Sequence, residues 1–176
     1  MEAIRSSRTI LLVEGILFTI LGILAVAVPM VSTLATELFL GWLLIFGGLV
    51  QGYRAFKGRE KQGFYASLLS AVVNFILGVL LILYPVAGII SLTILLTAYF
   101  ILEGLAKIVF AFQIRPAARW GWLAFSGVLA LIMAYIIFAG WPTTAFWVIG
   151  LLVGINMIFF GIALITLSSA IPKEQQ

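Results

Sequence analysis

Two charged side chains lie inside an apolar stretch of this chain and could carry chemistry. Glu103 and Lys107 fall in "FILEGLAKIVFAF", residues 100–112. Their spacing of four residues places both on one face of a helix, in the order that favours an ion pair. Charged groups within a membrane are costly and often functional. The pair is therefore either a proton or ion site or a structural contact.

Four further polar side chains share this setting. Together they form a candidate intramembrane polar site, whose members are Glu14, Gln51, Asn74, Glu103, Lys107 and Asn156. Because Glu14 follows Arg8 by six residues, it lies at a depth similar to that of the pair, and we expect it to face the pair inside the bundle. Two interpretations stay open: interhelical contacts that fix helix register, or a proton, ion or ligand pathway.

The residue types exclude several kinds of chemistry. The chain has no cysteine and no histidine, which rules out disulfides, thiol catalysis and His-centred metal sites. Phosphate-binding loops, dinucleotide motifs, nucleophile elbows and carboxylates at metal-ligand spacing are also missing from the sequence. We therefore predict no catalytic, cofactor-binding or metal-binding residues and no enzymatic activity. Glu37 is the only acidic residue expected near the outer face, and no continuous hydrophilic channel is evident.

Long apolar runs must position these side chains. Of the 176 residues, 64% are hydrophobic and only 9% are charged, which indicates an integral membrane protein. A spanning helix needs roughly 20 mostly apolar residues. Six runs meet this requirement, at about 9–28, 34–56, 64–84, 88–112, 120–138 and 144–168. The expected fold is all-α, a single six-helix membrane domain over residues 1–176, with its first helix retained rather than cleaved as a signal peptide.

Basic residues predict the orientation of the helices. Nine cluster at the termini and in the connections between the second and third and the fourth and fifth helices: Arg5, Arg8, Arg54, Lys57, Arg59, Lys61, Arg115, Arg119 and Lys173. The other three connections carry none. Because basic loops stay in the cytoplasm, we expect both termini there. The net charge of +4 then needs no nucleic-acid partner.

The sequence also repeats itself. The segment "ILGILAVAVP", residues 20–29, recurs as "ILGVLLILYP", residues 76–85. We call the distance along the chain from residue 20 to residue 76 the repeat offset. Gly48 and Gly104 are separated by the same distance. A third copy is fainter: Pro142 corresponds to Pro85, and Gly161 corresponds to Gly104. Each of these two separations is one residue longer than the repeat offset. We predict three parallel two-helix hairpin repeats, at about 9–56, 64–112 and 120–168, with the prolines in short outer connections. Parallel repeats give no positive support to the rocking mechanism of inverted-repeat transporters.

Glycines provide a further pattern. Gly48 and Gly52 form one G-x-x-x-G motif and Gly150 and Gly154 another, while two other pairs are spaced by seven residues. The predicted helix-packing glycines are Gly15, Gly22, Gly48, Gly52, Gly150, Gly154 and Gly161. Small residues let helix backbones approach within lipid. These faces predict either internal packing or an interface between copies of the chain.

Several of these segments resemble the HdeD-like acid-resistance membrane proteins of bacteria. They are "GILFTILGILAVAVP", "LGWLLIFGGLVQGYRAF", "LEGLAKIVFAF" and "WPTTAFWVIGLLVGINMIFFGIA", and the resemblance covers about residues 12–167. It implies a multi-pass protein of the bacterial inner membrane linked to survival of acid stress, without assigned catalytic residues. Where such proteins often carry an acidic residue in the last helix, this chain has Asn156, so the resemblance does not extend to a carboxylate there.

Two functions are compatible with these features. The chain is expected to act as a compact structural or partner-binding bundle, surrounded by the lipid bilayer and associated with a second copy or another membrane protein. The alternative is a small transporter or channel for protons, ions or a small solute. A hydrated path joining Asn74, Asn156 and Glu103 would favour this alternative.

Overall fold

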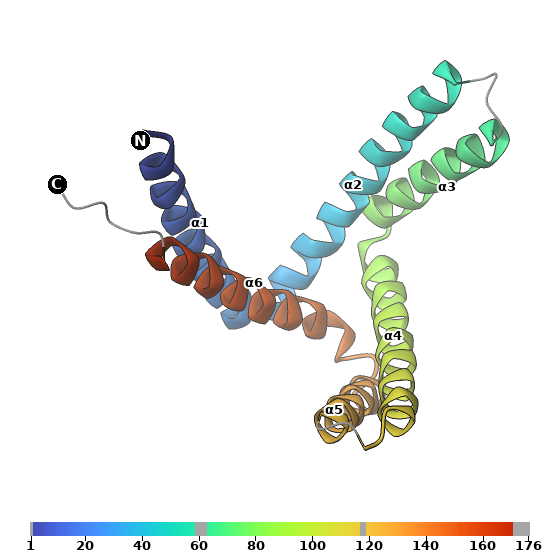
Figure 1. The fold of residues 1–176 in the computed structure, drawn as a ribbon. Helices are drawn as coiled ribbons and strands as arrows, with labels where there is room; N and C mark the ends of the chain where they lie inside the picture. The colour runs from blue at the N-terminus through green and yellow to red at the C-terminus, as the bar shows by residue number, and fades with distance from the viewer. Residues whose placement is uncertain (1, 59–62, 117–118, 171–176) are drawn as a thin grey trace. The chain divides into compact units, whose positions relative to one another are not determined.

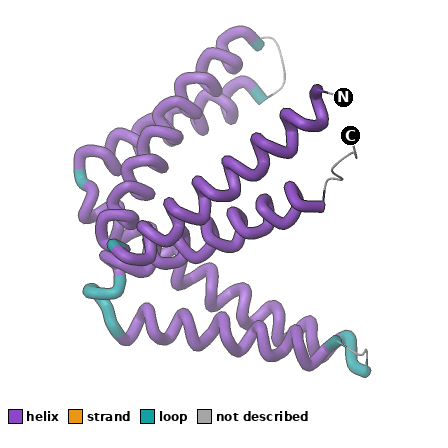
Figure 2. Tube along the Cα trace, turned by 90° about the vertical axis from the view of Figure 1, so that its left-hand side faces the viewer, coloured by secondary structure: helices purple, strands orange, loops and turns teal. Residues whose placement is uncertain are grey.

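Six long helices make up the fold, as the computed structural model shows for residues 2–58, 63–116 and 119–170. They are α1 (Glu2–Ala27), α2 (Pro29–Lys57), α3 (Phe64–Leu83), α4 (Pro85–Gln113), α5 (Trp120–Ala139) and α6 (Ala145–Ala170) (Figures 1 and 2). Each is long and apolar enough to cross a membrane. The all-α, six-helix prediction is confirmed. Three of the basic residues used for orientation, Arg59, Lys61 and Lys173, lie outside the described residues.

Prolines begin two of the helices. Pro29 is the first residue of α2 and Pro85 the first of α4, where a missing N–H costs no helical hydrogen bond. The connection between the spans expected at about 9–28 and 34–56 is shorter than predicted, because only Val28 is bent there and its N–H still donates to the Leu24 carbonyl, at 3.0 Å. Gly63, with a φ of 99°, takes the left-handed conformation just before α3.

The chain divides into two compact units. The first comprises residues 1–33 and 147–176, and the second comprises residues 34–146. The first unit therefore holds α1, the first turn of α2 and most of α6, whereas the second holds the rest of α2, with α3, α4 and α5.

In the second unit, helices pack in two antiparallel pairs through their smallest residues. On α2 and α3, a Cβ atom on Gly48 would lie 2.8 Å from the Ala71 carbonyl oxygen, and one on Gly78 2.6 Å from the Gly41 oxygen. On α4 and α5, a Cβ on Gly104 would lie 2.8 Å from the Gly127 oxygen. Backbone therefore touches backbone in both pairs, which only small residues permit.

The first unit repeats this contact between α1 and α6. A Cβ on Gly15 would lie 2.8 Å from the Gly161 oxygen, and one on Gly22 2.7 Å from the Gly154 oxygen. Beyond Gly15, the Ser168 hydroxyl donates to the Arg8 carbonyl at 2.9 Å. The first and last helices thus pack in the same antiparallel manner as α2 with α3 and α4 with α5.

A seven-residue spacing underlies all three pairs. The small residues recur every seventh position on both partners: Gly41, Gly48 and Ala55 against Ala71 and Gly78; Thr97, Gly104 and Ala111 against Gly127 and Ala134; Gly154, Gly161 and Ser168 against Gly15 and Gly22. All of these except Thr97 are buried. The second helix of each repeat therefore packs on the first helix of the next repeat, and the last helix packs on the first.

The sequence repeat is consequently not the packing unit. Within the middle repeat, α3 and α4 run in different directions away from their connection (Figure 1). The sequence repeats in units of two helices, but the close glycine contacts join helices that belong to different repeats. Large apolar side chains elsewhere on the helices are exposed, as expected for surfaces that meet lipid.

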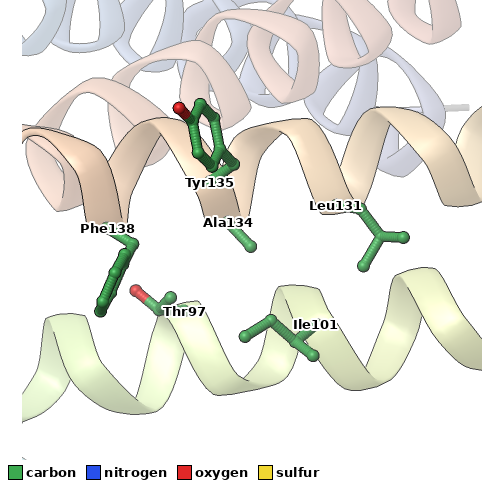
Figure 3. Close-up of a pocket in the computed structure, with 6 residues that line it drawn as sticks. All are labelled: Thr97, Ile101, Leu131, Ala134, Tyr135 and Phe138. Atoms are coloured by element: carbon green, nitrogen blue, oxygen red, sulfur yellow. The ribbon is translucent and has the colours of Figure 1, made fainter.

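The α4–α5 pair differs from the other two at one position. Thr97 and Ala134 stand where the other pairs have glycine on both helices, and a groove of about 230 Å³ lies beside them. Its lining residues are Thr97, Ile101, Leu131, Ala134, Tyr135 and Phe138 (Figure 3). Side chains in place of glycine keep helix backbones apart, which accounts for the groove.

Candidate functional site

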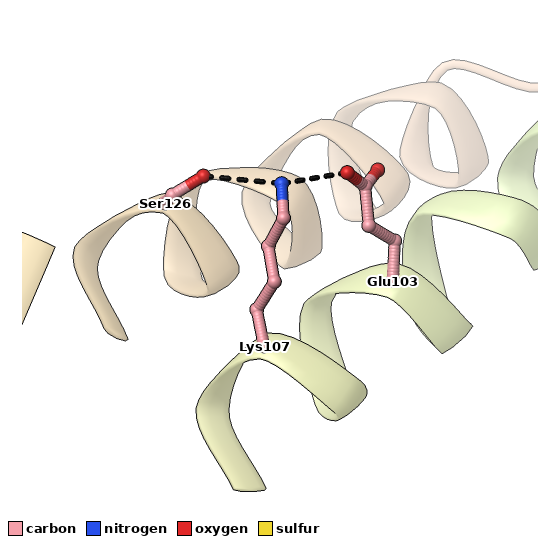
Figure 4. Close-up of polar contacts among 3 residues, drawn as sticks. All are labelled: Glu103, Lys107 and Ser126. Atoms are coloured by element: carbon pink, nitrogen blue, oxygen red, sulfur yellow. Dashed lines mark hydrogen bonds and ion pairs between the residues drawn. The ribbon is translucent and has the colours of Figure 1, made fainter. Parts of the chain in front are cut away.

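Glu103 and Lys107 form an ion pair on α4. The Lys107 ammonium lies 2.6 Å from Glu103 Oε1, as the spacing of four predicts, and it also donates to the Ser126 hydroxyl of α5 at 3.2 Å (Figure 4). About a third of the Lys107 side chain and a quarter of the Glu103 side chain are exposed. The contact with Ser126 makes the pair a link between two closely packed helices.

A second polar contact joins α2 to α3. The Asn74 amide nitrogen donates to the Gln51 Oε1 at 3.1 Å, and both side chains are half-buried. Gln51 precedes Lys107 by one repeat offset, the same separation as between Gly48 and Gly104. Gln51 and Lys107 therefore each bond to a side chain of the helix that packs against their own helix.

The other two candidates, Glu14 and Asn156, are exposed on α1 and α6 in the first unit. The Glu103–Lys107 pair belongs to the second unit. That Glu14 faces this pair stays a prediction. The structure thus brings together two pairs among the six candidates: Gln51 with Asn74, and Glu103 with Lys107.

Among the predicted packing glycines, Gly150 and Gly52 differ from the rest. Gly150 meets the first turn of α2: a Cβ there would overlap the Pro29 carbonyl oxygen, and its N–H donates to the Thr33 hydroxyl at 2.9 Å. A Cβ on Gly52 would meet only the Ala71 methyl, at an ordinary 3.7 Å. The seven-residue spacing, rather than G-x-x-x-G, therefore describes the close contacts within the three helix pairs, and Gly150 adds one between α6 and the first turn of α2.

Sequence reasoning missed a set of fully buried polar residues, Thr33, Glu37 and Thr93. The Thr93 hydroxyl donates to the Ile89 carbonyl at 2.8 Å and lies 3.5 Å from the Ala145 carbonyl at the start of α6. Glu37, expected near the outer face of the membrane, is fully enclosed by protein atoms. Glu37 and Thr93 are separated by the repeat offset, a signal that could have identified them as equivalent positions.

The part of the chain that the structure describes contains no group of three or more acidic, histidine or cysteine side chains that could hold a metal ion. The arrangement favours contacts between helices. Carboxylate, ammonium, amide and hydroxyl groups meet in pairs at helix crossings.

Comparison with known proteins identifies the family. Residues 13–83 and 69–139 both match the family described as a short repeat of unknown function, DUF308. The chain belongs to this family. The starts of the two matches are separated by the repeat offset that relates Gly48 to Gly104, which confirms the repeat. Each DUF308 match spans three helices, α1 to α3 and α3 to α5, and so includes one helix pair that packs across a repeat boundary.

Curated relatives extend the comparison along the chain. It is 25% identical over 178 aligned positions to Protein HdeD of Escherichia coli strain K12, with 99% of this chain and 93% of the relative covered. The same values hold for Protein HdeD of Escherichia coli O157:H7 and of Shigella flexneri. No solved structure matches the chain. The resemblance to HdeD-like membrane proteins is thus confirmed, and this DUF308 protein is a multi-pass membrane protein similar to Protein HdeD.

Proposed function

We propose that this HdeD-type protein supports survival of acid stress as a structural or partner-binding membrane bundle without enzymatic activity. The observation that carries the proposal is the use of polar side chains at helix crossings. Lys107 binds both Glu103 and Ser126, and Asn74 binds Gln51, so these groups hold helices to one another. The acid-stress role comes from the resemblance to HdeD-like proteins.

The membrane and the partners belong to the same proposal. The protein lies in the bacterial inner membrane with both termini in the cytoplasm, because nine basic residues gather at those ends of the helices. The exposed faces of the helices are rich in large apolar side chains. Such faces suit the lipid bilayer, a second copy of the chain or another membrane protein, and not a nucleic acid.

Acid survival of a strain lacking the protein tests the proposal. The strain is complemented with the wild type or with the Glu103→Gln/Lys107→Met double variant, and survival is normalised to the amount of protein in the membrane. We expect the wild type to restore survival and an equally abundant double variant to do the same. A second double variant, Gln51→Leu/Asn74→Ala, removes the other polar contact between helices and serves as a matched control.

Two outcomes would contradict the proposal in different ways. If the wild type gives no benefit, the acid-stress role is wrong. If the double variant is abundant but does not protect, the charges act in function rather than packing. Proton and ion flux through purified protein in liposomes would then be measured, as the transporter alternative requires.

A further inference from the structure

Glu37, the ninth residue of α2, carries a carboxyl group that is fully buried. Neither of its oxygens has a hydrogen-bond partner among the described residues. The carboxyl lies against Gly88 in the first turns of α4, and Leu81 of α3 closes the same space. Buried polar groups are nearly always paired, so this exception calls for an explanation.

The chain makes room for this carboxyl at Gly88. A Cβ atom on Gly88 would overlap Glu37 Oε1. At the equivalent position of the first repeat, Ser32 carries a hydroxyl that donates back seven residues, to the Ala25 carbonyl at 3.2 Å. In the third repeat Thr144, the residue just before the equivalent Ala145, donates in the same way to the Ile137 carbonyl at 2.7 Å. In the middle repeat, glycine takes this place where the glutamate side chain enters. Glycine and glutamate therefore form one fitted contact.

Among the residues of the second unit that the structure describes, no cationic side chain forms an ion pair with Glu37. Helices α3 and α5 contain no acidic or basic residue, and neither does α6. On α4, Glu103 and Lys107 follow Gly88 by 15 and 19 residues, or roughly 22 and 28 Å along the helix. On α2, the basic residues Arg54 and Lys57 lie in its last turn. Tyr84, the titratable residue immediately before α4, is exposed.

A proton meets these conditions better than a metal ion. Burying an unpaired carboxylate costs much more free energy than burying its neutral, protonated form. The positive end of the α4 dipole favours the anion, but this effect is smaller than the cost of burying an unpaired charge. The same dipole repels a bound metal cation, and hard cations require several oxygen ligands rather than one carboxylate.

We propose that Glu37 is a proton-binding site, occupied when α2 packs against Gly88 of α4, and that loss of the proton loosens this contact. The inference goes beyond the proposed function, because it describes the isolated protein and holds whether or not the protein contributes to acid survival. Since the packed state binds one more proton than the loosened state, its stability falls as the pH rises.

Infrared spectroscopy and thermal unfolding of the purified chain in lipid nanodiscs test the proposal. At neutral pH the wild type is expected to show the carbonyl band of an un-ionised carboxylic acid. Glu37→Gln, which keeps the side-chain volume, should remove this band, and Glu14→Gln, the matched change at an exposed carboxyl, should leave it. The wild-type melting temperature should fall on raising the pH, while that of Glu37→Gln should not.

A second variant keeps the test decisive if Glu37→Gln does not fold. Gly88→Ala retains the carboxyl but displaces it, so the band should shift or disappear. The proposal is overturned if the wild type lacks the band at neutral pH, or if the band survives in Glu37→Gln or is unaltered in Gly88→Ala. A rise in the wild-type melting temperature with Na⁺ or K⁺ that Glu37→Gln lacks would identify a metal site instead.

Discussion

Gly48 of α2 lies against the backbone of Ala71 and Phe75 on α3, while its neighbour Gly47 has no atom of another helix within contact distance. A Cβ atom on Gly48 would lie 2.8 Å from the Ala71 oxygen and 2.9 Å from the Phe75 nitrogen; one on Gly47 would meet nothing within 4 Å. Two adjacent glycines therefore have opposite roles.

This difference gives the first prediction. Gly48→Ala should lower the free energy of unfolding by about 1–3 kcal/mol, because the backbones must separate. Gly47→Ala should raise it by about 0.4–1 kcal/mol, because alanine restricts the unfolded chain. Denaturant titration of both variants in the same detergent measures the contrast. Equal effects would show that α2 and α3 do not pack through this face.

The Lys107 contacts give the second prediction. Glu103→Gln or Lys107→Met alone should cost about 1–3 kcal/mol of unfolding free energy, since each leaves a partly buried charge without its partner. The double variant should cost less than the sum of the two. Ser126→Ala should cost about 0.6 kcal/mol, as interhelical hydrogen bonds in membranes do. Additive effects in the double-mutant cycle would mean that the ion pair contributes no coupling.

The groove between α4 and α5 gives the third prediction. Ile101 lines it, whereas Ile45, the equivalent residue one repeat earlier, packs on Gly78 of α3. Ile101→Phe should change the free energy of unfolding by less than about 1 kcal/mol, because the ring enters open space. Ile45→Phe should cost about 1–3 kcal/mol through overpacking. The reverse order would place the open space in the α2–α3 pair.

The positions of the helices could be predicted from the sequence, whereas their partners could not. Apolar runs and prolines mark spans and boundaries, because lipid imposes length and apolarity on a spanning helix. The repeat offset relates Gly48 to Gly104, but it holds equally whether a helix packs within its own repeat or on the next. That choice depends on backbone contacts between residues distant in sequence.

The candidate site could likewise be predicted only in part from the sequence. The pair Glu103 and Lys107 could be predicted because a spacing of four is a local property of one helix. The contact between Asn74 and Gln51 and the burial of Glu37 could not, because each depends on what another helix presents. In the sequence, Glu37 looks like an ordinary polar residue near a helix end. Only the structure shows that Gly88 leaves room for its carboxyl group.

The α1–α6 pair supplies the last prediction, on circular permutation. The Ser168 hydroxyl bonds to the Arg8 carbonyl, so the ends of the first and last helices lie side by side. Their glycines keep the same seven-residue register as the other pairs, so α6 and α1 are as suited to a direct connection as α2 and α3. We predict that a chain beginning at Phe64, with residues 176 and 1 joined by a Gly/Ser linker, folds and inserts.

The permuted chain keeps every helix pair and its positive-inside pattern, because the new ends open on the same side of the membrane as the old ones. Its abundance and helical content in detergent should match those of the wild type. The same chain with Gly15→Leu, which forces α1 away from Gly161, should accumulate less. Failure of the permuted chain beside a stable wild type would mean that the α1–α6 contact does not replace a hairpin connection.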